Sequence, residues 1–222
     1  LYRNEQYLQA VEHFQQAVNH PIEVGARLTG AYYYGGRCWY KLENYQAAVD
    51  MWATIIVDYP NSSYHEKSEY YSGRSYYSLK QYQEAIDLLS LVQSTELLPL
   101  SLLYIAKSHY QLADIAENAN LIDERTAQYV KLREVIKYLH TLTSTAEEWL
   151  LASGGELNGK SYYNEQDYQD AYDAFMFVAS SWPASSSAPD CHYYAGKSSY
   201  HMSVSPYSDT LATFQEVRTL YQ

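Results

Sequence analysis

Apolar residues recur at intervals of three or four along most of the chain, which is the spacing of amphipathic α-helices. In the segment 31–60 this pattern is interrupted once, at the polar pair Glu43-Asn44. The interruption predicts a tight turn between two helices. Pro60 predicts the end of the second helix, and Asn61-Ser62-Ser63 predicts a polar connector.

The same helix–turn–helix pattern returns along the chain without a linker between copies. Its copies predict a partial repeat at 1–20, repeats at 30–60, 66–98 and 150–183, a degenerate repeat at 100–145 and a drifted last repeat at 190–222. In the degenerate repeat, polar residues such as Asp114 and Glu117 predict a weak second helix that is displaced or lengthened. The spacing of Ser63 and Glu66 predicts a capping box at the start of the third of these units. We expect one continuous domain over 1–222.

A five-residue motif marks the first helix of each unit. A small residue is followed at once by a basic residue and, three positions later, by tyrosine. The copies are Gly36-Arg37…Tyr40, Gly73-Arg74…Tyr77, Ala106-Lys107…Tyr110, Gly159-Lys160…Tyr163 and Gly196-Lys197…Tyr200. Self-similarity at this period predicts an all-α solenoid.

The units resemble the tetratricopeptide repeat. Counted from the small residue, they share an aromatic at +3, alanine at +12 and a bulky residue at +16, with proline at +24 in two copies; in the first complete unit these are Gly36, Trp39, Ala48, Trp52 and Pro60. The resemblance implies a right-handed α-solenoid whose first helices line a concave surface. It also implies a scaffold that binds other proteins or peptide segments and is not an enzyme.

The connectors Tyr-Pro-Asn-Ser and Trp-Pro-Ala-Ser are similar to those of tetratricopeptide proteins of the bacterial cell envelope. Examples are the coordinator of the Tol-Pal system and the lipoprotein of the outer-membrane barrel-assembly machine. This resemblance implies a place in or facing the periplasm, within a larger assembly.

The repeated motif also predicts a binding surface. On a helix the basic residue, the tyrosine at +4 and the residue at −3 lie on one face. We expect a groove that binds partner segments carrying carboxylates, because the cations would position the acids and the tyrosines would supply contact area. Its expected residues are Tyr33, Arg37, Tyr40, Tyr70, Arg74, Tyr77, Lys107, Tyr110, Lys160, Tyr163, Tyr193, Lys197 and Tyr200.

Three other interpretations stay open. The tyrosines could pack against the neighbouring repeat while each cation pairs with a nearby acid. A row of aromatic rings also suits a glycan-binding module, for which Glu156 and Asn164 are the polar residues nearest the stripe. The chain could instead be a structural segment of a larger repeat protein; since it opens at Leu1, we expect a fragment with any targeting segment upstream.

Composition narrows the classes of partner. The net charge is −11 and charged residues make up only 18 % of the 222 residues, which argues against nucleic-acid binding. No run of apolar residues is long enough to span a membrane. Tyrosine is the conspicuous residue, with 27 copies, and it suits half-buried positions between helices.

No pattern predicts catalysis, a cofactor or a metal site. The seven histidines lack metal-ligand spacing, and His109 falls at a core position of its helix. Cys38 and Cys191 lie several repeats apart, so we expect two unpaired thiols.

Overall fold

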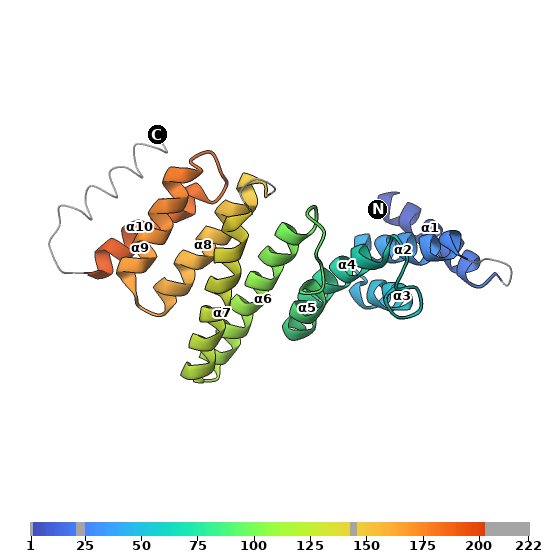
Figure 1. The fold of residues 1–222 in the computed structure, drawn as a ribbon, viewed down its shortest axis with the longest axis horizontal. Coiled ribbons are helices and arrows are strands. Elements are labelled where there is room, and N and C mark those ends of the chain that lie inside the picture. Colours follow the sequence, from blue (N-terminus) through green and yellow to red (C-terminus); the bar gives the residue numbers. More distant parts are fainter. Residues whose placement is uncertain (1, 21–24, 143–145, 203–222) are drawn as a thin grey trace. The chain divides into compact units, whose positions relative to one another are not determined.

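The structure, a computed structural model, describes residues 2–20, 25–142 and 146–202 (Figure 1). Within these ranges there are ten α-helices and no strand, which confirms the all-α fold class. The helices are α1 (Tyr2–Val18), α2 (Ala26–Lys41), α3 (Tyr45–Asp58), α4 (His65–Ser78), α5 (Tyr82–Leu89), α6 (Leu98–Asn118), α7 (Ile122–Thr141), α8 (Glu148–Asn164), α9 (Tyr168–Ser181) and α10 (Ala188–Met202). None of the helices in the described ranges combines the length and apolar character that a membrane span needs.

The chain divides into two compact units, Leu1–Ser108 and His109–Gln222. In the first unit, consecutive helices from α1 to α5 pack against each other, so that α1 contacts α2 and the series ends with α4 against α5. In the second, α7, α8, α9 and α10 do the same, and α10 also contacts α8. The neighbours in sequence are thus neighbours in space, as in a helical-repeat protein.

The small residue of each motif allows two helices to approach closely. A Cβ added at Gly36 would lie 2.5 Å from Cε2 of Trp52, and one added at Gly159 would lie 2.5 Å from Cε1 of Phe175. Both aromatic side chains are fully buried. In these two repeats the small residue and the bulky residue at +16 are therefore one packing pair, which places the core between the first and second helices.

The turn between the two helices of a repeat has one recurring geometry. Glu43, Lys80 and Gln166 adopt positive φ values of 60°, 63° and 65°, each seven residues after its glycine. The amide after each of them donates to a carbonyl five residues earlier, as in the bond of 3.0 Å from Asn44 to Trp39. This is the Schellman motif, which ends a helix and reverses the chain.

In the degenerate repeat, the same Schellman motif occurs seven residues later, which is about two turns of helix. Its left-handed residue is Asn120, with φ 57°, fourteen residues after Ala106 instead of seven. Because seven residues make about two turns, α6 is longer by that amount, and α7 has 20 residues where α3 and α9 have 14. The expectation of a lengthened second helix is confirmed, but Asp114 and Glu117 belong to the first helix and do not weaken the second.

The capping box predicted from Ser63 and Glu66 was wrong. Helix α4 begins at His65 without a side-chain cap. The carboxylate of Glu66 instead accepts backbone N–H bonds from Gln93 at 2.7 Å and Ser94 at 2.6 Å, which close the chain after α5. Its true partners lie 27 and 28 residues away in sequence, where no local pattern points.

The two ends of the predicted array are described only in part. Helix α1 supplies the helix expected at 1–20, and α10 supplies the first helix of the last repeat. The residues expected in its second helix, Thr210, Phe214 and Val217, lie outside the described residues.

Candidate functional site: the Tyr/Arg/Lys ladder

Two arginines of the predicted binding surface form hydrogen bonds to tyrosines within their own helices. In α2, Nη1 of Arg37 donates to the hydroxyl of Tyr33 at 3.1 Å. In α4, Nη1 of Arg74 donates to the hydroxyl of Tyr70 at 3.4 Å. Both tyrosines are buried, with 5 % and 2 % of their surface exposed, so they hold the arginines in place and offer little area to a partner.

Each arginine also reaches across to the next repeat. The guanidinium of Arg37 lies 4.3 Å from the ring centroid of Tyr71, and that of Arg74 lies 4.8 Å from that of Tyr104. Such cation–π contacts contribute about 0.5–2 kcal/mol, depending on burial. Tyr71 and Tyr104 occupy the −2 position of their own motifs.

The tyrosines at +4 meet the same rings. Tyr40 packs edge-on against Tyr71 with centroids 6.1 Å apart, and Tyr77 against Tyr104 at 5.5 Å. The basic residue and the +4 tyrosine of one repeat thus hold the −2 tyrosine of the following repeat. We call this set of side chains, repeated along the first helices, the Tyr/Arg/Lys ladder.

The second unit repeats this arrangement with lysine. Lys160 lies 5.4 Å from the ring centroid of Tyr194, at −2 of the next motif, and Tyr163 packs edge-on against the same ring at 5.7 Å. Lys160 also forms an ion pair of 2.5 Å with Glu156. Lys197 lies 4.9 Å from the ring of Tyr163.

The remaining predicted residues differ in their exposure. Tyr193 and Tyr200 in α10 are 51 % and 68 % exposed. Lys107 lies over the ring of Tyr104 at 5.2 Å, within its own helix. After Lys107 the sequence offers no tyrosine for the next cation–π contact, because the following −2 position holds Leu157.

The polar residues that favoured a glycan site have internal partners. The side-chain amide of Asn164 donates to the hydroxyls of Tyr110 at 3.1 Å and Tyr129 at 2.8 Å. Glu156 is paired with Lys160. The amide nitrogen of Asn164 and Oε1 of Glu156 are therefore already engaged within the chain.

The electrostatics of the ladder keep its cations charged and its phenols neutral. Burial lowers the pKa of Arg74, but the phenol oxygens of Tyr70, Tyr104 and Tyr40 outweigh this effect, so that the pKa lies above its ordinary value. Burial raises the pKa of Tyr70 to about 12. Among the described residues, neither Arg37 nor Arg74 forms an ion pair with a carboxylate, and the Nε atom of each is buried without an acceptor.

A small pocket adjoins the ladder between α1 and α2. Its volume is about 260 Å³, and it is lined by Tyr7, Phe14, Tyr34, Arg37, Cys38 and Lys41. Tyr34 is 48 % exposed and stacks on Phe14 with centroids 6.2 Å apart. The pocket therefore offers aromatic rings beside two cationic side chains.

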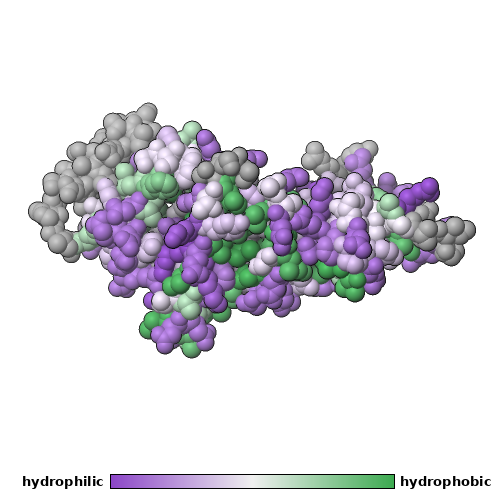
Figure 2. All heavy atoms as spheres, viewed as in Figure 1, coloured by the Kyte–Doolittle hydropathy of each residue, from purple (hydrophilic) through white to green (hydrophobic). Residues whose placement is uncertain are grey.

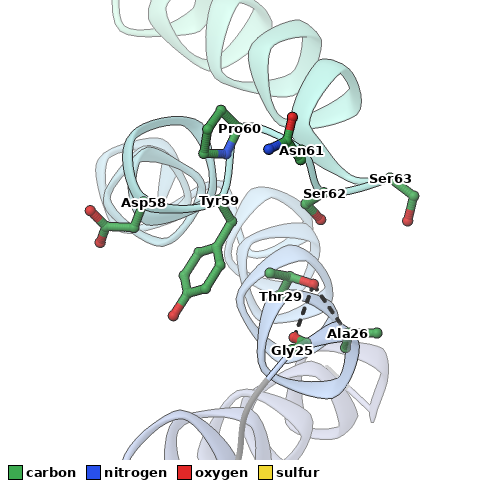
Figure 3. A pocket seen from close by; sticks show the side chains of 9 residues that line it. All are labelled: Gly25, Ala26, Thr29, Asp58, Tyr59, Pro60, Asn61, Ser62 and Ser63. Carbon is green, nitrogen blue, oxygen red and sulfur yellow. Dashed lines mark hydrogen bonds between the residues drawn. The ribbon is translucent and has the colours of Figure 1, made fainter.

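A larger pocket of about 420 Å³ lies where the connector after α3 passes the start of α2. Figure 3 shows the hydroxyl of Thr29 bonded to the carbonyls of Gly25 and Ala26, while Asp58 points away from them. It contains no residue of the ladder. The hydroxyl of Thr29 is thus engaged with the start of its own helix.

The other titratable residues considered in the sequence are structural. His109 is 7 % exposed and its Nδ1 lies 2.7 Å from Oε1 of Gln128. Burial raises the pKa of the Cys191 thiol to about 12, and both cysteines are unpaired and buried. Within the described ranges, no three His, Cys, Asp or Glu side chains are grouped so as to hold a metal ion.

Comparisons with known proteins agree with the helical-repeat fold. Residues 31–62 and 67–94 match the family model of the tetratricopeptide repeat. These two segments are thus similar to the tetratricopeptide repeat. These two segments are the α2–α3 and α4–α5 pairs, the part of the ladder that holds Arg37 and Arg74.

Solved structures share the tetratricopeptide fold at low sequence identity. The apo form of RapI is 13 % identical with a TM-score of 0.66; the alignment covers 98 % of this chain and 59 % of that one. A Podosopora anserina protein of nearly identical TPR-like repeats is 14 % identical, with a TM-score of 0.54 and coverage of 91 % and 97 %. A thermophilic tetratricopeptide-repeat protein of Thermus thermophilus is 13 % identical, with a TM-score of 0.50 and coverage of 85 % and 89 %. A search of curated proteins found no match.

The −2 tyrosines are the part of the site that sequence reasoning missed. Tyr71, Tyr104 and Tyr194 recur at one motif position, so the repeat alignment contained the signal. Helix geometry alone places the −3 residue on the same face as the cation. The contact of the −2 tyrosine depends on how its repeat stacks on the preceding one.

Proposed function

We propose that this chain is a non-enzymatic scaffold whose Tyr/Arg/Lys ladder binds partner segments that carry carboxylates. Tetratricopeptide repeats generally mediate protein–protein interaction, and two of them match here. The observation that carries the proposal is the set of partners that Arg37 and Arg74 have. Tyrosines hold both, and neither is neutralised by a described carboxylate.

Packing alone does not require this arrangement. A cation that only filled space between repeats in a chain of net charge −11 would have acids available as partners, as Lys160 has Glu156. The tyrosines instead restrict the arginine side chains without cancelling their charge. A partner carboxylate would then bind a guanidinium whose conformational entropy is already reduced.

The pocket between α1 and α2 is the most accessible place for such a contact. Arg37 and Lys41 would bind the acid, and Tyr34 would cover an adjacent apolar side chain of the segment. Tyrosine supplies contact area at low entropic cost, which suits recognition of a short peptide.

A random peptide library displayed on phage tests the proposal. Peptides selected by the wild-type protein should be enriched in Asp and Glu beside apolar residues, and binding should fall about tenfold or more in Arg37→Gln. Lys131→Gln, which removes an exposed charge from α7, is the matched control and should bind as wild type. Equal binding by Arg37→Gln and wild type would refute the ladder as the binding site.

Two broader proposals rest on sequence. The motif of small residue, cation and tyrosine occurs in both units, which supports one repeat array over 1–222. The Tyr-Pro-Asn-Ser and Trp-Pro-Ala-Ser connectors support a role in a bacterial cell-envelope assembly. Fractionation of cells that express the protein from its native gene should then recover it with the envelope; recovery in the cytosol alone would contradict that role.

A further inference from the structure

The α6–α7 hairpin has an extension that the other repeats lack. Its turn lies seven residues further from the small residue of the motif than in the other repeats, so the two helices run about 10 Å further before the chain reverses. Figure 1 shows this end of the hairpin reaching past the end of α8. The extension, residues 113–127, belongs to the second unit.

Half-exposed apolar side chains lie on the extension. Ile115, Leu121 and Ile122 are 54 %, 46 % and 63 % exposed. The amide of Leu121 donates to the carbonyl of Ala116 at 2.9 Å, so the turn brings Leu121 back beside the last turns of α6. Figure 2 shows hydrophobic atoms at this end of the hairpin, next to hydrophilic ones.

Acidic residues surround these apolar side chains. Asp114 and Glu117 lie on α6, and Asp123 and Glu124 are in the first turn of α7. The single described cation of the extension, Arg125, lies 3.5 Å from Glu117 and neutralises only that acid. The pKa of Asp114 is raised, first by burial and then by the charge of Glu117, which is the effect expected where negative charges crowd together.

A purely structural role explains some of these residues and not others. Acids in the first turn of α7 stabilise the helix through its dipole. The exposed isoleucines have no such role, because each could be polar without loss to the turn. Two added helical turns that carry apolar residues on an acidic background are better explained by a partner.

We propose that the tip of the α6–α7 hairpin, defined by Ile115, Leu121 and Ile122 with Asp123 and Glu124, binds a basic amphipathic segment of another protein. The partner's apolar side chains would cover the three exposed residues. Its lysines and arginines would pair with the surrounding acids, and the charge complementarity excludes an acidic segment of the kind that suits the ladder. The tip shares no residue with the ladder, and it binds the opposite kind of charge.

Two synthetic peptides of 15 residues test this proposal by fluorescence anisotropy. Both are amphipathic helices with leucine at every third or fourth position; one has lysine elsewhere and the other has glutamate at the same positions. The wild-type protein should bind the lysine peptide about tenfold or more tightly than the glutamate peptide. The double variant Ile115→Ser/Ile122→Ser should reduce that binding about tenfold, because it removes most of the apolar contact.

Matched controls separate the tip from general charge. Val57→Ser alters an exposed apolar side chain of α3, 74 % exposed, and should bind as wild type. The variant Asp123→Asn/Glu124→Gln should weaken binding of the lysine peptide and reduce its dependence on salt. Arg37→Gln should leave it unchanged, so this test can fail while the ladder proposal stands.

Four results would overturn the proposal. One is equal affinity for the two peptides; another is binding that the Ile115→Ser/Ile122→Ser variant retains. The third is wild-type self-association, seen by sedimentation, that this variant abolishes, since the tip would then bind a second copy of the chain. Binding of wild type, and not the variant, to phosphatidylcholine vesicles with no affinity for the lysine peptide would overturn it as well.

Discussion

The pair of glycines in α2 offers a matched test of how the repeats pack. Gly36→Ala adds a Cβ 2.5 Å from Cε2 and 2.9 Å from Cδ1 of the Trp52 ring. Gly30→Ala adds the same group to the same helix, but its nearest neighbours are atoms of Tyr64 at 3.8 Å, an ordinary contact distance. The two substitutions therefore differ in packing alone.

The structure sets the expected magnitudes. Trp52 is fully buried and its Nε1 donates to the carbonyl of Tyr33 at 3.1 Å, so the ring cannot move without weakening that bond. Overpacking costs about 1–3 kcal/mol, and the strained hydrogen bond costs about 1 kcal/mol. Replacing glycine by alanine inside a helix stabilises the folded state by about 0.5–1 kcal/mol. We expect Gly36→Ala to lower the free energy of unfolding by about 1–3 kcal/mol and Gly30→Ala to raise it by about 0.5–1 kcal/mol.

Urea denaturation followed by far-UV circular dichroism and tryptophan fluorescence measures both changes. A second comparison shows whether the contact itself is responsible. In a Trp52→Phe background the additional cost of Gly36→Ala should shrink, because the smaller ring leaves room for the methyl group. Equal stability of the Gly36→Ala and Gly30→Ala proteins would refute the close helix approach on which the repeat packing rests.

The remaining predictions concern the ladder, one carboxylate and one thiol. Tyr71→Leu should destabilise the first unit by about 1–2 kcal/mol in urea denaturation, because it removes the ring that Arg37 and Trp52 contact; Tyr200→Leu, at an exposed position, should change stability by less than about 0.5 kcal/mol. Burial raises the pKa of Glu66, but two backbone N–H bonds outweigh it, so the pKa lies below its ordinary 4.5 and the folded state binds fewer protons. Its stabilisation is present above pH 4.5 and is lost as pH falls through the lowered value, so Glu66→Gln should cost about 1 kcal/mol at pH 7 and should flatten the acid limb of a stability-against-pH curve. Cys191 should react with iodoacetamide more than about a hundredfold more slowly in the native protein than in urea, measured by mass spectrometry, because burial raises its pKa to about 12; equal rates would contradict its burial.

The fold was predictable because the repeat unit is local. The pairing of a small residue with a bulky one sixteen positions later fixes two helices against each other, as Gly36 and Trp52 show. The turn at Glu43-Asn44 was also predictable, although Glu43 itself, a non-glycine residue at positive φ, gave no warning of its conformation.

The extension at α6–α7 was harder to predict, because polar residues can end a helix or cover its exposed face. Asp114 and Glu117 suggested a weak second helix, yet the distance from Ala106 to Asn120 is two helical turns more than in the other units. The position of Asn120, a residue tolerated in the left-handed region, was the sequence signal for the longer hairpin.

The candidate site was predictable on each helix and not between helices. Arg37 and Tyr33 lie four residues apart, so their contact follows from helix geometry. The stacking of Arg37 on Tyr71 depends on the angle between repeats, and a chain with 27 tyrosines gives many equivalent candidates. Glu66 illustrates the same limit, since the two amides that it accepts belong to the next connector.

The central claim is that the arginines of the ladder are held by tyrosines so that they can bind a partner's carboxylate. Selection of a displayed random peptide library against wild type and Arg37→Gln, with Lys131→Gln as control, tests it most directly. The account predicts Asp- and Glu-rich peptides from wild type and Lys131→Gln, and loss of that class with Arg37→Gln. Recovery of the same acidic peptides by Arg37→Gln, or no acidic enrichment with wild type, would contradict the claim and leave the ladder as packing between repeats.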